Sequence, residues 1–382
     1  MSIGIAKGVL LVGFLSVLVV GVIEAQHDPN AENTRFRPTG PVNGKGGQAI
    51  SGPYEVVLDW PQPLPGHEAW HTGRGAAVHA ESPDRVYVAL TGEIPADYQG
   101  PRAWGPTTIP TLYPVTSALT REKGRWEHSI MVLDRNGRLL ESWEQWNSVI
   151  QGIQRMVLNP NDPEHHVWIP GVGVFTRDGK EMVVSFRTDC EAGTRPCVAA
   201  QGSHLDWLPN GDFFIASNTS VVKWSKDWKK LAEFGRAGSG PLEFNGIHGL
   251  VVDATRDRIY ISDRGNSRIQ ILDLNGNLLD TWPNLVAPYC IRLTADGQYL
   301  WVTDGFAHNF SKYEAMTGKL LTTWGTFGSV PGTLWGPHDF DTDSEGNLYI
   351  AEDYNARVQK FRPMKDTNFP EQLIGQLKPG GR

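Results

Sequence analysis

The sequence predicts an all-β protein built as a six-bladed β-propeller that is closed by an N-terminal strand. Two observations lead to this fold class, the composition and a repeated strand. The 382 residues include 42 glycines, 26 prolines and 14 tryptophans, which is typical of short strands joined by many turns. Because 40% of the residues are apolar and 20% are charged, the chain can bury a large core.

The repeated strand fixes the number of blades. A short apolar strand recurs six times, with centres at Tyr87, Trp168, Phe214, Tyr260, Trp301 and Tyr349. The last five centres lie 41 to 48 residues apart, which is about the length of a four-stranded propeller blade. The longer first interval contains an insertion with prolines and tryptophans, residues 91–126.

The turns and the two ends of the repeat complete the prediction. Glycine follows Asn, Asp or Glu between the predicted strands, as in Asn210-Gly211 and Asp296-Gly297, and supplies the positive φ angle of tight hairpins. The sixth unit lacks a fourth strand, whereas residues 54–61 read as a strand without a blade. Pairing the two closes the ring and leaves no open sheet edge, so an open solenoid is disfavoured.

The chain divides into four predicted segments. Residues 1–25 resemble a secretory signal peptide, because one lysine precedes an apolar run of 8–23 and a small residue ends the segment. Residues 26–52 form a predicted flexible linker, 53–364 the propeller and 365–382 a C-terminal tail. These features predict a secreted or periplasmic protein, with an uncleaved N-terminal anchor as the alternative. In an oxidising compartment Cys190 and Cys197 can form a disulfide.

The charge balance restricts the partners. With 35 basic and 42 acidic side chains the formal net charge is −7. The densest basic cluster is Lys226, Lys229 and Lys230, which is too small to follow a phosphate backbone. We therefore expect no nucleic-acid partner and no membrane span after signal cleavage. A small-molecule or peptide substrate, or a protein partner at the channel face, fits better.

Two stretches resemble the NHL repeat. The first is Phe244–Asp253 followed by Ile259–Gln270, and the second is Leu334–Phe340 followed by Tyr349–Gln359. The resemblance implies a propeller fold. It does not decide the function, because NHL propellers include both enzymes and binding platforms.

Residues at the start of the innermost strands are expected to form a ring around the central channel. Counting back from the strand centres gives the ring as Arg74, Gln154, His204, His248, Cys290 and His338, with a slip of one or two residues allowed in the weaker repeats. Histidines that converge from different blades can hold zinc with an open coordination position. The alternative is that each histidine only hydrogen-bonds to a neighbouring blade or to water.

Within the NHL class the chain resembles the peptidyl-α-hydroxyglycine α-amidating lyases. The resemblance implies zinc on His248 and His338, a catalytic role for Arg264 and Arg74, and calcium at Asp339. In such an enzyme zinc lowers the pKa of the substrate hydroxyl, and the arginines stabilise developing charge and orient the terminal carboxylate.

The match to the lyases is incomplete. The second blade offers Gln154-Arg155 where the family has a zinc histidine, so His204 is the candidate third ligand. The third blade offers residues 217–220 where the family has a catalytic tyrosine. His308 is a candidate substrate contact on the same face. A non-catalytic platform for a protein or a glycan is the rival hypothesis, with Tyr98, Trp104 and Tyr113 of the insertion as its contact surface.

Overall fold

The computed structural model describes residues 51–67, 70–95, 124–187 and 196–379. These residues belong to one compact unit, Phe36–Arg382. The predicted signal peptide, the linker up to residue 50, Cys190, and Tyr98, Trp104 and Tyr113 of the insertion lie outside the described residues. Among the described residues, no helix has the length and apolar character needed to cross a membrane.

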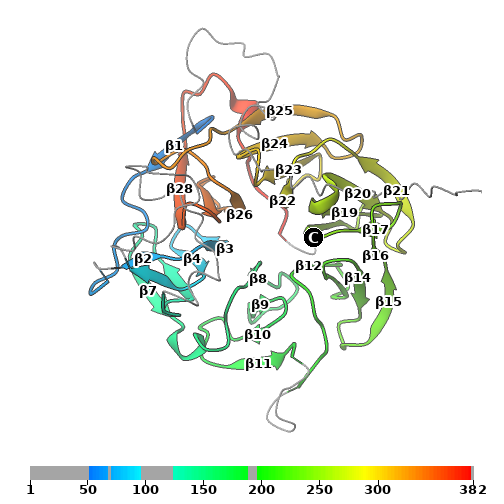
Figure 1. The fold of residues 1–382 in the computed structure, drawn as a ribbon, viewed down its shortest axis with the longest axis horizontal. Helices are drawn as coiled ribbons and strands as arrows, with labels where there is room; N and C mark the ends of the chain where they lie inside the picture. Colours follow the sequence, from blue (N-terminus) through cyan, green and yellow to red (C-terminus); the bar gives the residue numbers. More distant parts are fainter. Residues whose placement is uncertain (1–50, 68–69, 96–123, 188–195, 380–382) are drawn as a thin grey trace, which may run out of the picture. The chain divides into compact units, whose positions relative to one another are not determined.

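Six four-stranded antiparallel sheets surround a common centre (Figure 1). Each sheet is one blade, and the chain enters the first five blades at the innermost strand. The first blade consists of β3 (Gly75–Ser82), β4 (Arg85–Leu90), β6 (Ile130–Leu133) and β7 (Leu139–Ser142). The second consists of β8 (Val157–Leu158), β9 (Val167–Ile169), β10 (Gly173–Phe175) and β11 (Met182–Ser185).

The third to fifth blades follow the same order. The third has β12 (His204–Trp207), β13 (Phe213–Ala216), β14 (Val221–Trp224) and β15 (Lys230–Phe234). The fourth has β18 (Ile247–Asp253), β19 (Arg258–Asp263), β20 (Arg268–Leu272) and β21 (Leu278–Trp282). The fifth has β22 (Pro288–Leu293), β23 (Tyr299–Asp304), β24 (Asn309–Glu314) and β25 (Leu320–Trp324).

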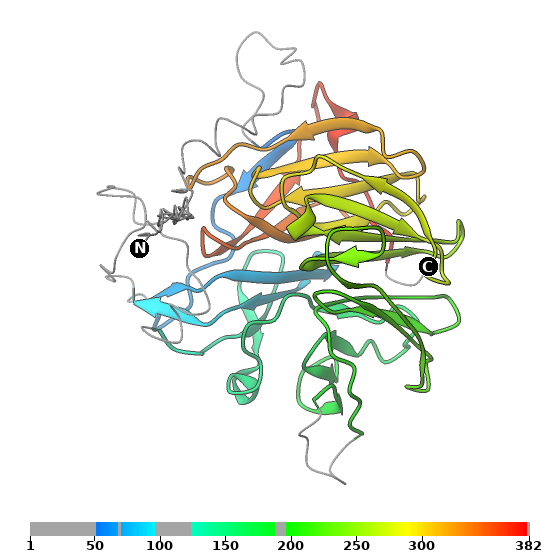
Figure 2. The same ribbon diagram turned by 45° about the vertical axis from the view of Figure 1, so that its right-hand side comes forward.

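The sixth blade joins the two ends of the propeller. It consists of β26 (Pro337–Thr342), β27 (Leu348–Glu352), β28 (Arg357–Pro363) and, as its outer strand, β1 (Tyr54–Val57). Strand β1 pairs with β28 in a register that sets Tyr54 opposite Pro363 and Val57 opposite Lys360. Figure 2 shows the blue β1 among the orange and red strands of the C-terminal part. The predicted six-bladed propeller with an N-terminal closing strand is therefore confirmed.

Smaller elements decorate the blades. Strands β2 (Trp70–Thr72) and β5 (Glu93–Pro95) pair with each other, and β16 (Arg236–Ala237) pairs in parallel with β17 (Glu243–Phe244). Three short 3₁₀ turns are η1 (Glu144–Trp146), η2 (Arg264–Asn266) and η3 (Pro370–Gln372). After η3 the tail packs on the sixth and fifth blades, where Ile374 N donates to the Tyr54 hydroxyl and Lys378 N donates to Leu293 O.

The innermost strands of the last three blades share an irregularity that shapes the channel. In β18 the pairing with β19 skips His248, and in β26 the pairing with β27 skips His338. In β22 the register shifts between Pro288 and Ile291. A bulge of this kind leaves a residue unpaired and turns its side chain away from the regular alternation. The bulges therefore take His248 and His338 out of the regular ladder, together with Tyr289 and Cys290 in β22.

Candidate functional site at the channel mouth

A cavity of about 480 Å³ opens where the innermost strands begin. Side chains from all six blades line it: Arg74, Gln154, Ser203, Asn218, Ile247, His248, Arg264, Tyr289, Asp353 and Tyr354. Four predicted site or ring residues are thus brought together, namely Arg74, Gln154, His248 and Arg264. We call this cavity the mouth pocket.

Strand register corrects two members of the predicted ring. In the fifth blade the bulge residue that corresponds to His248 and His338 is Tyr289, which lines the mouth pocket, whereas Cys290 does not line it. In the third blade His204 pairs with Ala216 in the same way as Gly249 pairs with Ser262. The lining residue of that blade is therefore Ser203, and His204 lies one position further along its strand.

The three predicted metal histidines are nevertheless neighbours. The His248 ring centroid lies 5.1 Å from that of His204 and 4.7 Å from that of His338. The Tyr289 ring stacks on His248 at 4.4 Å. His248 Nδ1 is buried and has no hydrogen-bond partner, so it is a free donor atom of the kind that a metal ion would satisfy. His248 thus offers one free ligand atom for zinc, whereas His204, His248 and His338 are not among the described groups of three or more side chains whose ligand atoms all lie within 4.8 Å of one another.

His338 is held more tightly by protein contacts. Its Nδ1 donates to the carbonyl oxygen of Ala76 at 2.6 Å, the kind of contact that fixes the ring of a metal-binding histidine. Its Nε2 accepts from the Arg74 guanidinium at 2.7 Å, and the same guanidinium nitrogen donates to Gln154 Oε1 at 3.1 Å. Arg74 also forms an ion pair with Asp353. A metal can bind His338 Nε2 only if Arg74 moves away from it.

Burial keeps all three imidazoles neutral. It lowers the pKa of His204 to about 3 and holds the pKa of His248 and of His338 well below the usual range. Neighbouring positive charge acts in the same direction, from Arg155 on His204 and from Arg74 on His338. Neutral imidazole is the form that binds metals and accepts hydrogen bonds.

Arg264 is the pocket cation that is not held by a direct ion pair among the described residues, although Asp353 of the same pocket lies near enough to feel its charge. Its guanidinium lies 5.1 Å from the centroid of the Tyr289 ring, and it forms no ion pair with any carboxylate among the described residues. The Tyr289 and Tyr354 hydroxyls lie 3.2 Å apart beside it. Burial raises the pKa of both tyrosines, so both hydroxyls keep their protons. This side of the pocket therefore offers one positive charge and two hydroxyl groups.

Asp339 lies in the layer behind the pocket. One of its carboxylate oxygens accepts from Arg155 at 2.7 Å, from the Cys290 thiol at 3.1 Å and from its neighbour Phe340 N at 3.0 Å. The other oxygen accepts from Val78 N at 3.2 Å. Arg155 supplies the positive charge that a calcium ion would supply next to Asp339. The calcium expectation thus gains no support from these contacts.

His308 and the predicted disulfide lie apart from the mouth pocket. His308 Nδ1 accepts from Gly336 N at 3.2 Å, its ring lies 4.8 Å from that of Phe327, and it does not line the mouth pocket. Cys197 is disulfide-bonded, whereas its predicted partner Cys190 lies outside the described residues. Cys290 is a free, buried thiol.

The structure adds pocket residues that the sequence did not point to. Tyr289 stands next to the predicted Cys290, and the structure shows that Tyr289 is the one of the two that lines the pocket. Asp353 and Tyr354 follow β27 in the second NHL-like stretch, at the position that corresponds to Arg264 and its neighbour in the fourth blade. An alignment of strand ends signals these two positions, although not their contacts.

Comparison with known proteins agrees with this architecture. Residues 244–272 match the NHL repeat family. The chain is a β-propeller that contains an NHL repeat. NHL repeat-containing protein 3 from Homo sapiens is 29% identical over 260 residues, which covers 62% of this chain and 73% of that protein. The Mus musculus protein of the same name is 28% identical over 261 residues, with 61% and 72% covered.

A solved structure shares the fold of this NHL-repeat propeller. It belongs to a protein of unknown function from Bacteroides thetaiotaomicron, with a TM-score of 0.51 and 12% identity over 76% of this chain and 70% of that chain. At this identity the likeness concerns the fold alone.

Proposed function

We propose that the mouth pocket binds a small molecule or a peptide end that carries a carboxylate. The observation that carries this proposal is the position of Arg264, a cation that lines the pocket and forms no direct ion pair among the described residues, since Asp353 of the same pocket pairs with Arg74. Guanidinium groups bind carboxylates through paired, charge-assisted hydrogen bonds. The Tyr289 and Tyr354 hydroxyls provide further hydrogen-bonding groups next to Arg264. The ligand would therefore enter with its carboxylate toward this side.

We further propose that the pocket holds a divalent metal, with zinc as the expected ion. His248 Nδ1 supports this proposal, because it is buried and lacks a hydrogen-bond partner. His204 and His338 are the neighbouring candidate ligands, but their ligand atoms and that of His248 do not all lie within 4.8 Å of one another, so both rings would have to turn toward the metal, His338 after Arg74 has moved. When bound, zinc supplies a Lewis acid that polarises an oxygen of the ligand.

The most specific form of the proposal is a lyase that resembles the peptidyl-α-hydroxyglycine α-amidating type. Arg264 would bind the terminal carboxylate of the substrate, and Arg74, released from His338, would stabilise negative charge that develops on the reacting oxygen. Tyr289 is the candidate tyrosine, since it lines the pocket and its ring stacks on His248 at 4.4 Å. It would take the part of the tyrosine that the third blade lacks.

A non-catalytic platform is the second candidate function. It is favoured by the contacts of Arg74, which occupies His338 Nε2 at 2.7 Å and is itself held by Asp353. In this form the pocket recognises a carboxylate on a protein or a glycan without cleaving a bond. We also propose that the protein is exported, which the disulfide at Cys197 supports because disulfides persist in oxidising compartments.

One experiment separates the two candidates. The purified full chain is analysed for bound zinc, and glyoxylate release is assayed with a peptide that ends in α-hydroxyglycine. The same two measurements are made on His248→Ala, Arg264→Gln and, as a control outside the pocket, His308→Asn. For the lyase we expect His248→Ala to bind one equivalent of zinc fewer than the wild type, and glyoxylate release to fall at least 100-fold in both pocket variants, roughly the effect of removing one charge-stabilising group.

The other outcomes are equally informative. Bound zinc without glyoxylate release would leave a metal-dependent site for a different carboxylate ligand. A folded wild type that binds no more zinc than His248→Ala would favour the platform. If Arg264→Gln bound and turned over the peptide as well as the wild type, the carboxylate proposal itself would be wrong.

A further inference from the structure

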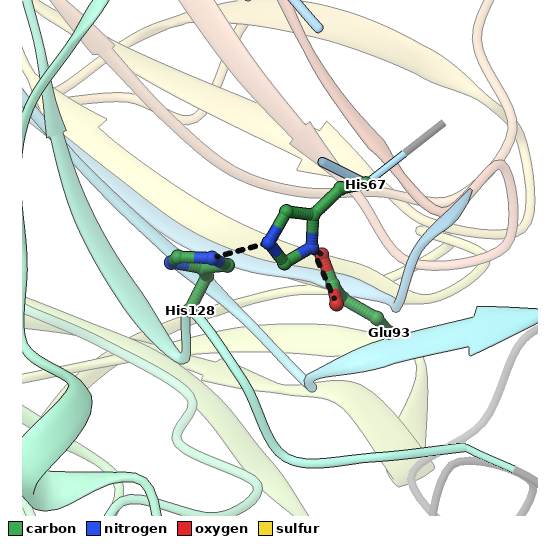
Figure 3. Close-up of side chains that lie close together, drawn as sticks. All are labelled: His67, Glu93 and His128. Carbon is green, nitrogen blue, oxygen red and sulfur yellow. Dashed lines mark hydrogen bonds and ion pairs between the residues drawn. The ribbon is translucent and has the colours of Figure 1, made fainter. Parts of the chain in front are cut away.

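A second cluster of histidines lies on an extension of the first blade. Strands β2 and β5 continue the β3–β4 ladder beyond Arg74, since Thr72 pairs with Glu93 and Gly73 N donates to Gly92 O at 2.6 Å. His67 precedes β2, Glu93 begins β5, and His128 precedes β6. Figure 3 shows their side chains converging. None of the three lines the mouth pocket.

The Nδ1 atoms of His67 and His128 each contact a polar group of the protein. His67 Nδ1 lies 2.8 and 3.1 Å from the two carboxylate oxygens of Glu93. His128 Nδ1 lies 2.7 Å from the Ser142 hydroxyl oxygen. His67 Nδ1 can donate to Glu93 or accept from Arg125, and His128 Nδ1 can donate to Ser142 or accept from it. With both Nδ1 atoms protonated, each Nε2 carries a lone pair.

The two Nε2 atoms face each other at 3.2 Å (Figure 3). Two lone pairs at this separation repel, so either a proton or a metal ion lies between the two nitrogens. For zinc with Zn–N distances of about 2.0–2.1 Å, two ligands at the tetrahedral angle lie about 3.3 Å apart. The observed separation matches that value. The competing explanation is a hydrogen bond from Nε2–H of one neutral ring to Nε2 of the other, with His67 Nδ1 accepting from Arg125.

We propose that His67 and His128 bind a divalent transition metal of the zinc class through their Nε2 atoms, with Glu93 orienting His67. A carboxylate behind a histidine fixes the ring and strengthens it as a ligand. Among the described residues, this is the one group of three or more His, Cys, Asp or Glu side chains whose ligand atoms all lie within 4.8 Å of one another. Water or a small ligand completes the coordination, which makes the site open.

The surroundings hold the site in place and set its charge. Glu93 and His128 are buried, with 2% and 7% of their surface exposed. Arg125 pairs with Glu93 at 2.9 Å and lies 2.9 Å from His67 Nδ1. Arg125 neutralises the carboxylate, so the metal meets two neutral ligands and a locally balanced charge. We therefore expect weaker binding than at a site with anionic ligands, and a preference for imidazole-binding metals over calcium or magnesium.

The test uses the full chain after removal of metal with a chelator. Zn²⁺ is titrated by calorimetry, and Co²⁺ is titrated while its visible absorption is recorded. Because the mouth pocket is proposed to bind zinc independently, every protein carries His248→Ala. Into this background we place His128→Asn, His67→Gln and Glu93→Gln, with His165→Asn as the matched control. His128 and His165 share a positive φ, 50° and 55°, that Asn tolerates, and His165 is exposed.

We predict that the background protein and the His165→Asn control each bind one equivalent of metal per chain. His128→Asn and His67→Gln should bind none. Glu93→Gln should keep the site with an affinity about 10- to 100-fold lower. His67→Gln is informative even if His128→Asn fails to fold, because the His67 side chain is 18% exposed. Unchanged stoichiometry in both histidine variants would overturn the proposal. So would an absence of metal binding in the folded background protein, since the rings then share only a hydrogen bond.

Discussion

At the scale of single residues, histidines of one chain have very different partners. His248 Nδ1 has no hydrogen-bond partner. Both ring nitrogens of His338 have partners, Ala76 and Arg74. Burial keeps both His248 and His338 neutral. His308 accepts a hydrogen bond from a backbone N–H. A free donor atom invites a ligand, whereas a satisfied one stabilises the fold. The role of each histidine thus follows from its contacts and not from its position in the repeat.

His308 gives a prediction for the pH dependence of stability. Burial lowers its pKa from the ordinary 6.5 to about 4. The unfolded chain therefore binds a proton below pH 6.5 that the folded chain refuses, and stability falls as the pH drops from about 6.5 toward 4. His308→Asn, which suits the positive φ of 56°, should remove roughly 2 kcal/mol of that pH-dependent loss. Urea unfolding of both proteins at pH 7 and pH 4.5 measures the difference.

The control for this prediction is His165→Asn, an exposed histidine with a similar φ of 55°. It should leave the slope of stability against pH unchanged. Parallel curves for the wild type and His308→Asn would contradict the buried, neutral state of His308.

At the scale of elements, glycine turns and outer tryptophans form the contacts between blades. A Cβ built at Gly318 would lie 2.5 Å from the Trp282 ring, which ends the outer strand of the preceding blade, and its φ is +70°. A Cβ at Gly179 would likewise lie 2.0 Å from the Trp143 ring. The turn glycine therefore makes room for the tryptophan of the neighbouring blade, in addition to permitting the turn itself.

A comparison of two turns separates the two effects of glycine. Gly346 has φ +79° and its nearest neighbour would lie 3.7 Å away, so Gly346→Ala incurs backbone strain alone. Gly318→Ala adds a collision with Trp282. We expect Gly318→Ala to lower the free energy of unfolding by about 1–3 kcal/mol more than Gly346→Ala. Urea denaturation followed by tryptophan fluorescence measures both, and equal losses would refute the packing role of Gly318.

The sequence predicted the blades more completely than it predicted the site. Strand centres and turn glycines repeat along the chain, so Tyr260 or Trp301 places a whole blade. The directions of the Tyr289 and Cys290 side chains depend on the bulge in β22. That bulge depends in turn on packing against the neighbouring blades. The cluster of His67, Glu93 and His128 unites residues up to 61 positions apart. No local pattern signals such a meeting, because the insertion that separates them belongs to one blade alone.

At the scale of the whole molecule, one strand fastens the ring of blades. Tyr54 of β1 is 1% exposed, packs on Trp324 of the fifth blade at 5.7 Å, and accepts a hydrogen bond from Ile374 N in the tail. The N-terminal strand, the fifth and sixth blades and the C-terminal tail therefore meet at one side chain. Loss of that side chain should weaken the closure of the entire propeller.

Tyr54→Ala tests this closure. The variant removes a buried aromatic ring and leaves Ile374 N without its acceptor, so we expect a loss of about 3–5 kcal/mol in the free energy of unfolding. Glu55→Ala on the same strand is the control, because the Glu55 side chain is 65% exposed. A loss as small as that of the control, measured by urea unfolding, would mean that β1 does not fasten the ring.

The central claim is that the mouth pocket combines a metal-binding histidine with an arginine that binds a carboxylate. Anomalous diffraction at the zinc edge, from crystals of the zinc-loaded full chain, tests it most directly. We predict a peak about 2.0–2.1 Å from His248 Nδ1, with Arg74 displaced from His338. Zinc-loaded crystals with no peak in the mouth pocket, and with Arg74 still bound to His338, would contradict the claim.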